Sequence, residues 1–232
     1  MKKSHNETKG VMESYDRIAE EFQHTRRTPW PSLKELGDCE GKAVLDLGAG
    51  TGRNSKALVA QGASIVVAAD LSFEMLRVIK RNSPTGGIIC PLRCNAMNLP
   101  FKPGIFDRVA FVATIHNIPQ RENREAAMVE VARVMAIGGR AVVTAWSRTQ
   151  SRFLKSGSSF LLEWLKGGEV GDIHIRWGNY ASRFYHLFTK AELKGTVGKA
   201  GLSITRAYGE KVSRKIFPEN WVIVAEKVPI NG

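Results

Sequence analysis

A cluster of glycines directly after an apolar run is the feature of the sequence most suited to chemistry. The segment LDLGAGTGRN places Gly48, Gly50 and Gly52 between a strand-like run and a helical stretch. Glycines let the chain turn sharply and let a ligand approach backbone N–H groups at a helix N-terminus. Position 53 is arginine, so the G-x-G-x-G spacing lacks the third glycine of the dinucleotide fingerprint G-x-G-x-x-G. The turn predicts a cofactor site that is not one for NAD, with a purely structural turn as the alternative.

Two acidic residues extend this pattern. Asp46 precedes the glycines, and Asp70 ends the next apolar run, 24 residues later. The pattern resembles class I S-adenosylmethionine (SAM) methyltransferases. In that fold a carboxylate at Asp70 takes the ribose hydroxyls, because carboxylates accept paired O–H donors well. The segment CNAMNLPF lies where these enzymes usually carry an Asp-Ala pair beside the adenine. The resemblance therefore implies SAM as cofactor, with contacts from Asp46, Asp70, Leu71, Asn95 and Ala96.

Three further segments narrow the resemblance. YDRIAEEFQHTRRTPWP (15–31), IHNIPQRENR (115–124) and RFYHLFTKAEL (183–193) are similar to the tRNA wobble-uridine methyltransferases that esterify 5-carboxymethyluridine. That family includes the methyltransferase domain of the AlkB-type tRNA-modifying protein. The chain departs from it at Asn117, where the family usually has a second histidine. The resemblance implies that Tyr15 covers the cofactor and that substrate contacts come from Arg26, Trp30, His116, Arg121, Arg124, Arg183, Tyr185 and His186.

The expected reaction, methyl transfer to a carboxylate, requires no general base. Methyl transfer from a sulfonium is an in-line displacement, so the protein mainly supplies alignment and a dry site. A carboxylate acceptor, with a pKa of ~4, is already nucleophilic at neutral pH and requires only groups that hold it. Arg26, His116 and Arg183 are therefore the expected catalytic residues. If the acceptor is a hydroxyl or a ring nitrogen, His116 is instead the expected base.

Several aromatic and histidine positions keep two interpretations. Trp30 and Trp177 could stack on an extruded base, since every base has a π face. Tryptophans are more often core residues, so Trp146, Trp164 and Trp221, which fall on apolar segments, are assigned to packing. His186 either contacts substrate or only packs.

Strand-like and helical runs alternate along the chain. The expected helices cover 53–61, 73–81, 121–135 and 190–200, and the expected strands cover 43–48, 65–69, 87–92, 106–113, 140–146, 202–208 and 221–227. The alternation predicts an α/β, Rossmann-like class I methyltransferase fold: a seven-stranded, mostly parallel sheet with an antiparallel last strand. We expect one domain over 1–232, with an N-terminal helical element at 11–36 and a basic substrate-binding insertion at about 147–182.

The positive charge is unevenly distributed. The net charge is +12, and residues 147–215 hold 13 Lys and Arg against 5 Asp and Glu. Such an excess favours a polyanionic partner, here tRNA, with a solvated basic surface as the alternative. A small-molecule SAM methyltransferase of the same fold and a non-catalytic module that binds tRNA or SAM are the rival functions.

Composition and edge pattern add expectations about compartment and partner. Three cysteines make no disulfide or zinc framework, no metal site is indicated, and the sequence shows neither an apolar run of ~20 residues nor a signal segment. We therefore expect a cytoplasmic protein without membrane contact. The apolar third strand (Gly86–Cys94), with Ile88 and Ile89, falls at a sheet edge. The resemblance implies a small zinc-binding activator protein paired there, with a strand simply sandwiched between helices as the alternative.

Overall fold

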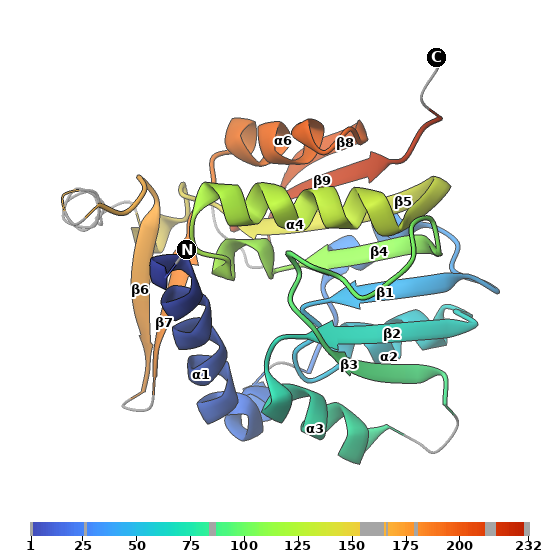
Figure 1. Ribbon diagram of the computed structural model, residues 1–232, viewed down its shortest axis with the longest axis horizontal. Coiled ribbons are helices and arrows are strands. Elements are labelled where there is room, and N and C mark those ends of the chain that lie inside the picture. The colour runs from blue at the N-terminus through green and yellow to red at the C-terminus, as the bar shows by residue number, and fades with distance from the viewer. Residues whose placement is uncertain are drawn as a thin grey trace.

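The computed structural model describes residues 2–25, 27–83, 87–153, 165, 167–178, 181–211 and 217–229. Figure 1 shows one long sheet with helices packed around it and a separate two-stranded ribbon beside the N-terminal helix. The helices are α1 (Lys2–Thr25), α2 (Arg53–Ala60), α3 (Phe73–Asn82), α4 (Arg121–Val134) and α6 (Lys190–Lys199), with short 3-10 turns η1 (Pro31–Leu36), η2 (Ile115–Asn117) and η3 (Ser151–Phe153). The strands are β1 (Ala43–Leu47), β2 (Ile65–Asp70), β3 (Ile89–Arg93), β4 (Phe106–Val112), β5 (Met135–Trp146), β6 (Asp172–Trp177), β7 (Ala181–His186), β8 (Ser203–Glu210) and β9 (Asn220–Glu226).

The seven-stranded sheet has the order β3-β2-β1-β4-β5-β9-β8. Strands β1 to β5 pair in parallel, and β9 runs antiparallel to both β5 and β8. The chain moves outward from β1 to β3 and then returns to β4, so the order reverses between β1 and β4. Ligands of open α/β sheets bind at such a reversal, beyond the carboxyl ends of the strands. The expected fold, including the antiparallel last strand, is confirmed.

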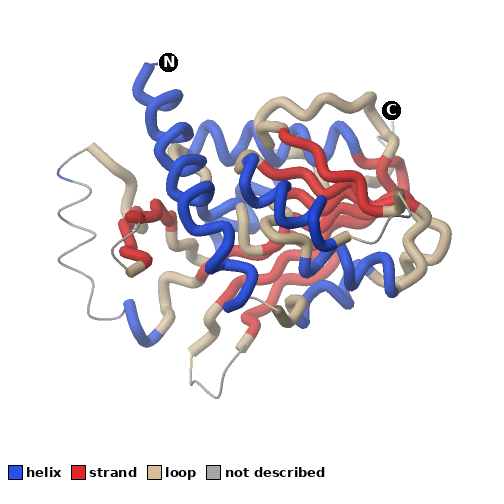
Figure 2. The backbone as a smooth tube through the Cα atoms, turned by 90° about the horizontal axis from the view of Figure 1, so that it is seen from below, coloured by secondary structure: helices blue, strands red, loops and turns tan. Residues whose placement is uncertain are grey.

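Alternation along the central strands places two cores on the two faces of the sheet (Figure 2). Leu45, Val109 and Val143 face the layer of α4 and α6. Val44, Ala110 and Val142 face the layer of η1 and α2. These strands are apolar at successive positions because both faces are covered, as in other parallel sheets. The sheet is therefore a rigid support for the loops at its carboxyl end.

The antiparallel ribbon β6–β7 is the main element that the sequence did not predict. It lies apart from the main sheet, beside α1, in both views (Figures 1 and 2). Strand β6 falls within the expected basic insertion and β7 begins at its end; in β6, exposed His174 and Arg176 alternate with partly buried Ile173 and Ile175. From the sequence alone, such a strand cannot be distinguished from a solvated basic segment. The N-terminal helical element starts earlier than expected, because α1 begins at Lys2, whereas η1 ends at Leu36 as expected.

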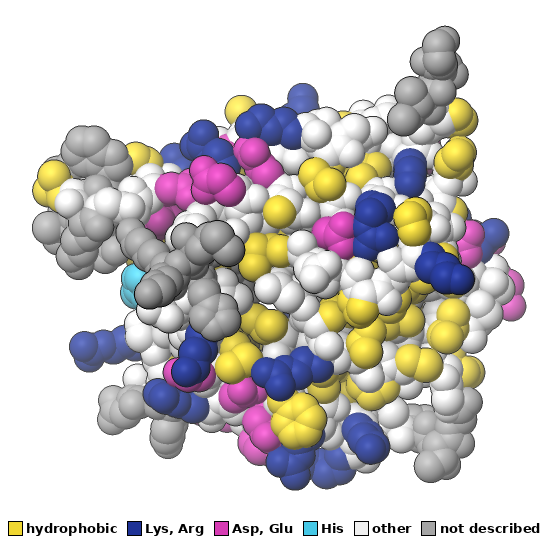
Figure 3. Space-filling model, in the orientation of Figure 1, with side chains coloured by type: hydrophobic (Ala, Val, Ile, Leu, Met, Phe, Trp, Pro, Cys, Tyr) yellow, Lys and Arg dark blue, Asp and Glu magenta, His cyan; other side chains and the backbone are white. Residues whose placement is uncertain are grey.

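Two surface features bear on partners. Strand β3 pairs only with β2 and so forms the expected sheet edge, and the Ile88 side chain just before it is 41% exposed. On the face shown in Figure 3, Lys and Arg side chains are interspersed with Asp and Glu and do not form one basic patch. Among the described residues, no helix combines the length and the apolar character needed to cross a bilayer.

Candidate active site

The glycine turn brings backbone groups to the carboxyl end of β1. Gly48 has φ +75, and a Cβ added there would overlap the Thr114 side chain. The N–H groups of Gly48 and Ala49 both donate to the carbonyl of Ala69, at 2.7 and 3.0 Å, which fastens the turn to the end of β2. Gly52, with φ +82, begins α2 at its N-cap. Glycine is required at Gly48 both for its left-handed backbone and for its close approach to the loop after β4.

Asp70 continues this arrangement from the neighbouring strand. Its Oδ2 accepts the N–H of Gly50 at 2.8 Å, and its Oδ1 accepts the N–H of Ser72 at 2.9 Å. Burial raises the pKa of Asp70, while the backbone N–H groups of Ser72 and Gly50 oppose that rise. The carboxylate lines the cavity described below. Each oxygen has a second lone pair for a ligand hydroxyl, so the position suits the expected ribose contact.

Asp46 lies beneath the turn. Its side chain is buried, Oδ2 accepts the Ser55 hydroxyl at 2.6 Å, and Oδ1 has no hydrogen-bond partner among the residues that the structure describes. Burial raises the pKa of Asp46 to about 6, against the hydrogen bond from Ser55, which lowers it. Asp46 is not among the residues that line the cavity. Its position is consistent with support for the turn from below.

A cavity of about 340 Å³ lies at the carboxyl ends of β1, β2 and β4. Most of the residues singled out from the sequence line it: Tyr15, Trp30, Gly48, Gly50, Asp70, Leu71, Asn95, Ala96, His116, Arg183 and Tyr185. The residues present fit SAM, because one wall offers the glycine turn and the Asp70 carboxylate. Asn95 on the adjoining loop accepts the N–H of Met97 through its Oδ1 at 3.0 Å, which leaves its amide N–H donors for an adenine edge.

Arg183 contributes a buried cation to the opposite wall. Only 5% of the residue is exposed, and its guanidinium lies 4.4 Å from the centre of the Trp177 ring and 5.2 Å from that of Tyr185. Its Nε is buried without a hydrogen-bond partner among the described residues. Aromatic faces stabilise a guanidinium but leave its N–H donors unused. A buried donor on a cation at a cavity wall is best satisfied by an anionic ligand.

His116 lies between Trp146 and Tyr185 in the same wall. Its ring stacks at 5.1 Å on Trp146 and at 5.5 Å on Tyr185, and the residue is 1% exposed. Burial lowers the pKa of His116 to about 3, and the positive charge of Arg183 adds to this effect. Nδ1 accepts the backbone N–H of Trp146 at 3.2 Å. The neutral ring therefore carries its proton on Nε2, which makes it an N–H donor and neither a cation nor a base.

Helix α1 closes the cavity from the N-terminal side. The Tyr15 hydroxyl donates to Oδ1 of Asn117 at 3.0 Å, and burial raises the pKa of Tyr15. Asp16 accepts the Ser72 hydroxyl at 2.5 Å and the N–H of Glu74 at 3.2 Å, which anchors α1 to the start of α3. The structure thus gives Asn117, where the family usually has histidine, a partner on the covering helix.

The assignment of Trp146 to packing alone is wrong. The Trp146 ring lines the cavity and stacks on Tyr185 at 4.2 Å with an interplanar angle of 5°. The Arg152 guanidinium lies 4.3 Å from the centre of the same ring. Trp221 does pack, against the core beneath α6. The signal available in the sequence was the position of Trp146 at the carboxyl end of a central strand, which is the edge where ligands bind.

Not every expected substrate residue reaches the cavity. His186 is fully buried between Asp172 and Glu192, Arg124 is 1% exposed and donates to Glu169, and Arg121 lies on the surface. None of these three lines the cavity, so the expectation of direct substrate contact is not supported for them. Their side chains are already engaged with acidic residues of the chain. Arg26 and Trp164 lie outside the described residues.

Sequence comparisons match the chain to known methyltransferases. A family model described as "Methyltransferase domain" matches residues 45–143. The tRNA (carboxymethyluridine(34)-5-O)-methyltransferase alkbh8 of Xenopus tropicalis is 31% identical over 66% of this chain, which spans only 23% of that protein. The tRNA (carboxymethyluridine(34)-5-O)-methyltransferase of Schizosaccharomyces pombe is 25% identical over 95% of this chain and 97% of its own length.

Solved structures support the fold. A SAM-dependent methyltransferase of Methanosarcina mazei superposes with a TM-score of 0.72 at 23% identity, over 87% of this chain and 99% of its own. A methyltransferase of Haloferax volcanii, solved in complex with the Trm112 methyltransferase activator, superposes with a TM-score of 0.69 at 16% identity, over 94% of this chain and 100% of its own. With its glycine turn, Asp70 and strand order, the chain has the fold of the class I SAM-dependent methyltransferases, matches the methyltransferase domain model over residues 45–143, and is similar in sequence to the tRNA carboxymethyluridine methyltransferases.

Proposed function

We propose that this protein methylates the carboxylate of 5-carboxymethyluridine at the wobble position of tRNA. The observation that carries the proposal is Arg183, a buried guanidinium in the wall of the cofactor cavity whose Nε has no hydrogen-bond partner in the described part of the chain. A small carboxylate beside the methyl donor would satisfy it. The relatives with this activity, one of them matched over nearly its whole length, have a substrate of that chemistry.

The roles of the chain's residues follow from the geometry. Arg183 would hold one carboxylate oxygen, and the Nε2–H of His116 is available as a second donor. Because both groups donate to the ground-state carboxylate, they orient it and leave one oxygen lone pair to attack. We also propose that Arg26, which the sequence indicates as a catalytic residue, supplies a second cation for the carboxylate.

Bound SAM would supply an electrophilic methyl group on a sulfonium. Its transfer to a carboxylate would remove two opposite charges and would require no proton to move. Water stabilises separated charges, so its exclusion favours this step. Trp146, Tyr185 and Tyr15 line the cavity with rings and lower its polarity. The neutral His116 fits a reaction without a general base.

The expected protein partner remains part of the proposal. Strand β3 leaves one row of N–H and C=O groups unpaired within the main sheet, next to the exposed Ile88. A small zinc-binding activator of the Trm112 type could add a strand there and cover the isoleucine. The Haloferax neighbour, solved in complex with such an activator, supports the idea. A tRNA substrate would also place the protein in the cytoplasm.

The test is reconstitution with defined tRNA. The protein, alone and with the activator from the same organism, is incubated with SAM and tRNA from cells that lack this methyltransferase. Mass spectrometry of the wobble nucleoside should show 5-carboxymethyluridine converted to its methyl ester. Free carboxylic acid metabolites serve as competing acceptors. Conversion of metabolites but not of tRNA would indicate a small-molecule enzyme, and SAM binding with no turnover would indicate a binding module; either result contradicts the proposal.

A further inference from the structure

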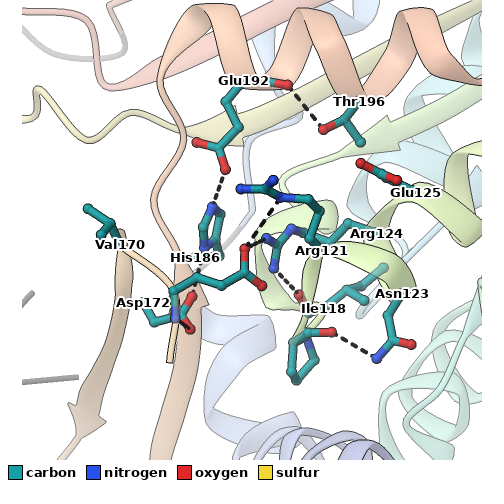
Figure 4. Close-up of polar contacts among 12 residues, drawn as sticks. Ile118, Arg121, Asn123, Arg124, Glu125, Val170, Asp172, His186, Glu192 and Thr196 are labelled. Carbon is teal, nitrogen blue, oxygen red and sulfur yellow. Dashed lines mark hydrogen bonds and ion pairs between the residues drawn. The ribbon is translucent and has the colours of Figure 1, made fainter. Parts of the chain in front are cut away.

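The three residues that do not reach the cavity, His186, Arg124 and Arg121, lie together behind it. Figure 4 shows His186 between Glu192 and Asp172, with Arg121 and Arg124 directed toward the same cluster. The cluster joins residues from α4, β6, β7, α6 and the loop before β6. It lies outside the cofactor cavity, and the proposed chemistry uses none of its members.

His186 is held on both sides. Its Nδ1 lies 2.7 Å from Oδ1 of Asp172, its partner across the ribbon, and its Nε2 lies 2.7 Å from Oε1 of Glu192 at the start of α6. Both ring nitrogens therefore lie within hydrogen-bond distance of a carboxylate oxygen. Burial tends to raise the pKa of Glu192, but the hydrogen bond and charge of His186 together with Arg148 lower it overall. His186 thereby fixes the end of β7 to both β6 and α6.

Arg124 carries the connection to the other wall of the cavity. Its Nη2 donates to Oε2 of Glu169 at 2.6 Å, and its Nη1 donates to the carbonyl of Ile118 at 3.2 Å. Glu169 in turn donates its backbone N–H to Oδ2 of Asp172 at 2.8 Å. Ile118 directly follows η2, which carries His116. One chain of charged contacts therefore runs from α6 through β7 and β6 to the loop after β4.

We propose that this chain of contacts, Glu192–His186–Asp172 and Glu169–Arg124–Ile118, is a positioning network for the acceptor site. It sets β7, with Arg183 and Tyr185, against the loop that carries His116. Among the described residues the ribbon is not a strand of the main sheet; two backbone hydrogen bonds of Phe188, with Trp146 and Arg148, tie the end of β7 to the end of β5, and side-chain contacts hold the rest of the ribbon. The inference rests on the proposed function only for the identity of the acceptor.

Two other interpretations, a cation site and a role in stability alone, explain the cluster less well. Glu169, His186 and Glu192 lie close enough to hold a cation, but Arg121, Arg124 and Arg148 already pair with the two glutamates. A role in stability alone would not require Arg124 to reach the Ile118 carbonyl as well as Glu169. A planar guanidinium holds its donors in a fixed geometry toward two acceptors on different segments, whereas an ammonium is a compact point charge on a flexible stem. Arg124 is therefore the residue at which positioning and stability can be separated.

The test compares Arg124→Lys and His186→Gln with two controls. Lys199→Met removes an ion pair that also joins α6 to α4, at 2.6 Å from Glu125 but without a path to the cavity. Val197→Ala makes a cavity on the buried side of α6 and is the control for a general loss of stability. We expect the network variants to lower kcat on tRNA by roughly ten- to hundredfold, since small misplacement of reacting groups is costly, with SAM affinity within about twofold of wild type. The controls should keep kcat.

Hydrogen exchange supplies a readout that needs no substrate. In Arg124→Lys, the amides of 113–118 and those of 181–187 should both exchange faster, while exchange in the glycine turn is unchanged. In Val197→Ala, the exchange rates of these two segments should not rise together. If the wild type methylates no tRNA, the proposed function fails, and exchange alone decides the network. Glu169→Gln, which keeps an acceptor for Arg124 but removes its charge, replaces His186→Gln if that variant does not fold. Wild-type kcat in Arg124→Lys, or exchange confined to one segment, would overturn the proposal.

Discussion

The two walls of the cavity are held in place by different kinds of interaction. The cofactor wall is built mainly from backbone groups: the N–H groups of Gly48 and Ala49 bond to the Ala69 carbonyl, and the N–H of Gly50 bonds to the Asp70 carboxylate, both at the end of β2. The acceptor wall is built from side chains of Trp146, Tyr185 and Arg183, which belong to strands of two separate sheets.

This difference has a consequence for how each wall responds to change. Backbone hydrogen bonds within a sheet survive most substitutions, because they do not depend on the side chain. A stack of rings and cations depends on each member. The acceptor wall should therefore be the more sensitive of the two, and its variants should affect turnover while leaving SAM binding intact.

Replacing the cation of the acceptor wall should have the largest effect. Arg183→Lys keeps the charge but loses the planar fork that stacks on Trp177 and Tyr185. We expect kcat/KM on tRNA bearing 5-carboxymethyluridine to fall roughly hundred- to thousandfold, the cost of losing one aligned donor in a catalytic site. Calorimetry should show an unchanged SAM dissociation constant. A weaker SAM complex with normal turnover would instead assign Arg183 to the carboxylate of the cofactor.

Beneath the cofactor wall, Asp46→Asn should alter the pH dependence of stability. Burial raises the pKa of Asp46 to about 6 from its usual value of 3.8, so between these values the folded chain binds a proton that the unfolded chain has lost. Stability therefore falls as pH rises from 3.8 to 6, by up to about 3 kcal/mol. Asparagine removes this dependence. Urea unfolding at pH 4 to 7 should show that the free energy of unfolding of the variant rises relative to that of the wild type as the pH increases. The same pH dependence in both proteins would contradict the raised pKa.

The sequence predicts the cofactor wall well because its determinants are local. Gly48 and Asp70 follow apolar runs, and parallel strands bring their carboxyl ends to one edge. The alternation of helix and strand was equally informative, and the central elements lie within a few residues of their expected bounds. Edge strand β3 and the antiparallel β9 were also anticipated from connectivity alone.

The acceptor wall could not be derived in this way. Trp146 was read as a core residue, since a large apolar side chain on a buried strand has the same pattern whether it packs or lines a cavity. His186 and Arg124 were read as substrate contacts, because a sequence does not show which acidic residues will lie beside a cation. Their partners Glu192 and Glu169 come from other elements. Tertiary placement, and not local pattern, decides these roles.

Within the cofactor wall, Asp70→Ala should have a smaller effect than either change above. Losing charge-assisted hydrogen bonds to a ribose should weaken SAM binding by about 2 kcal/mol, roughly thirtyfold. Asp70→Asn is the matched control, because it keeps an acceptor for the N–H of Gly50. Calorimetry with SAM measures both. Equal affinity of the alanine variant and wild type would show that the ribose is held elsewhere and that the two walls are wrongly divided.

The smallest effect is expected at His116, and it separates two chemical roles. Burial lowers the pKa of His116 to about 3, so the ring stays neutral from pH 5 to 9 and should leave no inflection in the pH profile of kcat. Its Nδ1 accepts the N–H of Trp146, which leaves only a donor toward the cavity. Glutamine reproduces this pattern, since its oxygen can accept from Trp146 while its N–H₂ donates. His116→Gln should therefore lose no more than about threefold in kcat, and His116→Leu about tenfold, the cost of one hydrogen bond. A general base would lose at least roughly a hundredfold in both variants and show a titration in the wild type. That outcome would move the acceptor away from a carboxylate and toward a hydroxyl or a ring nitrogen, for which proton removal is required.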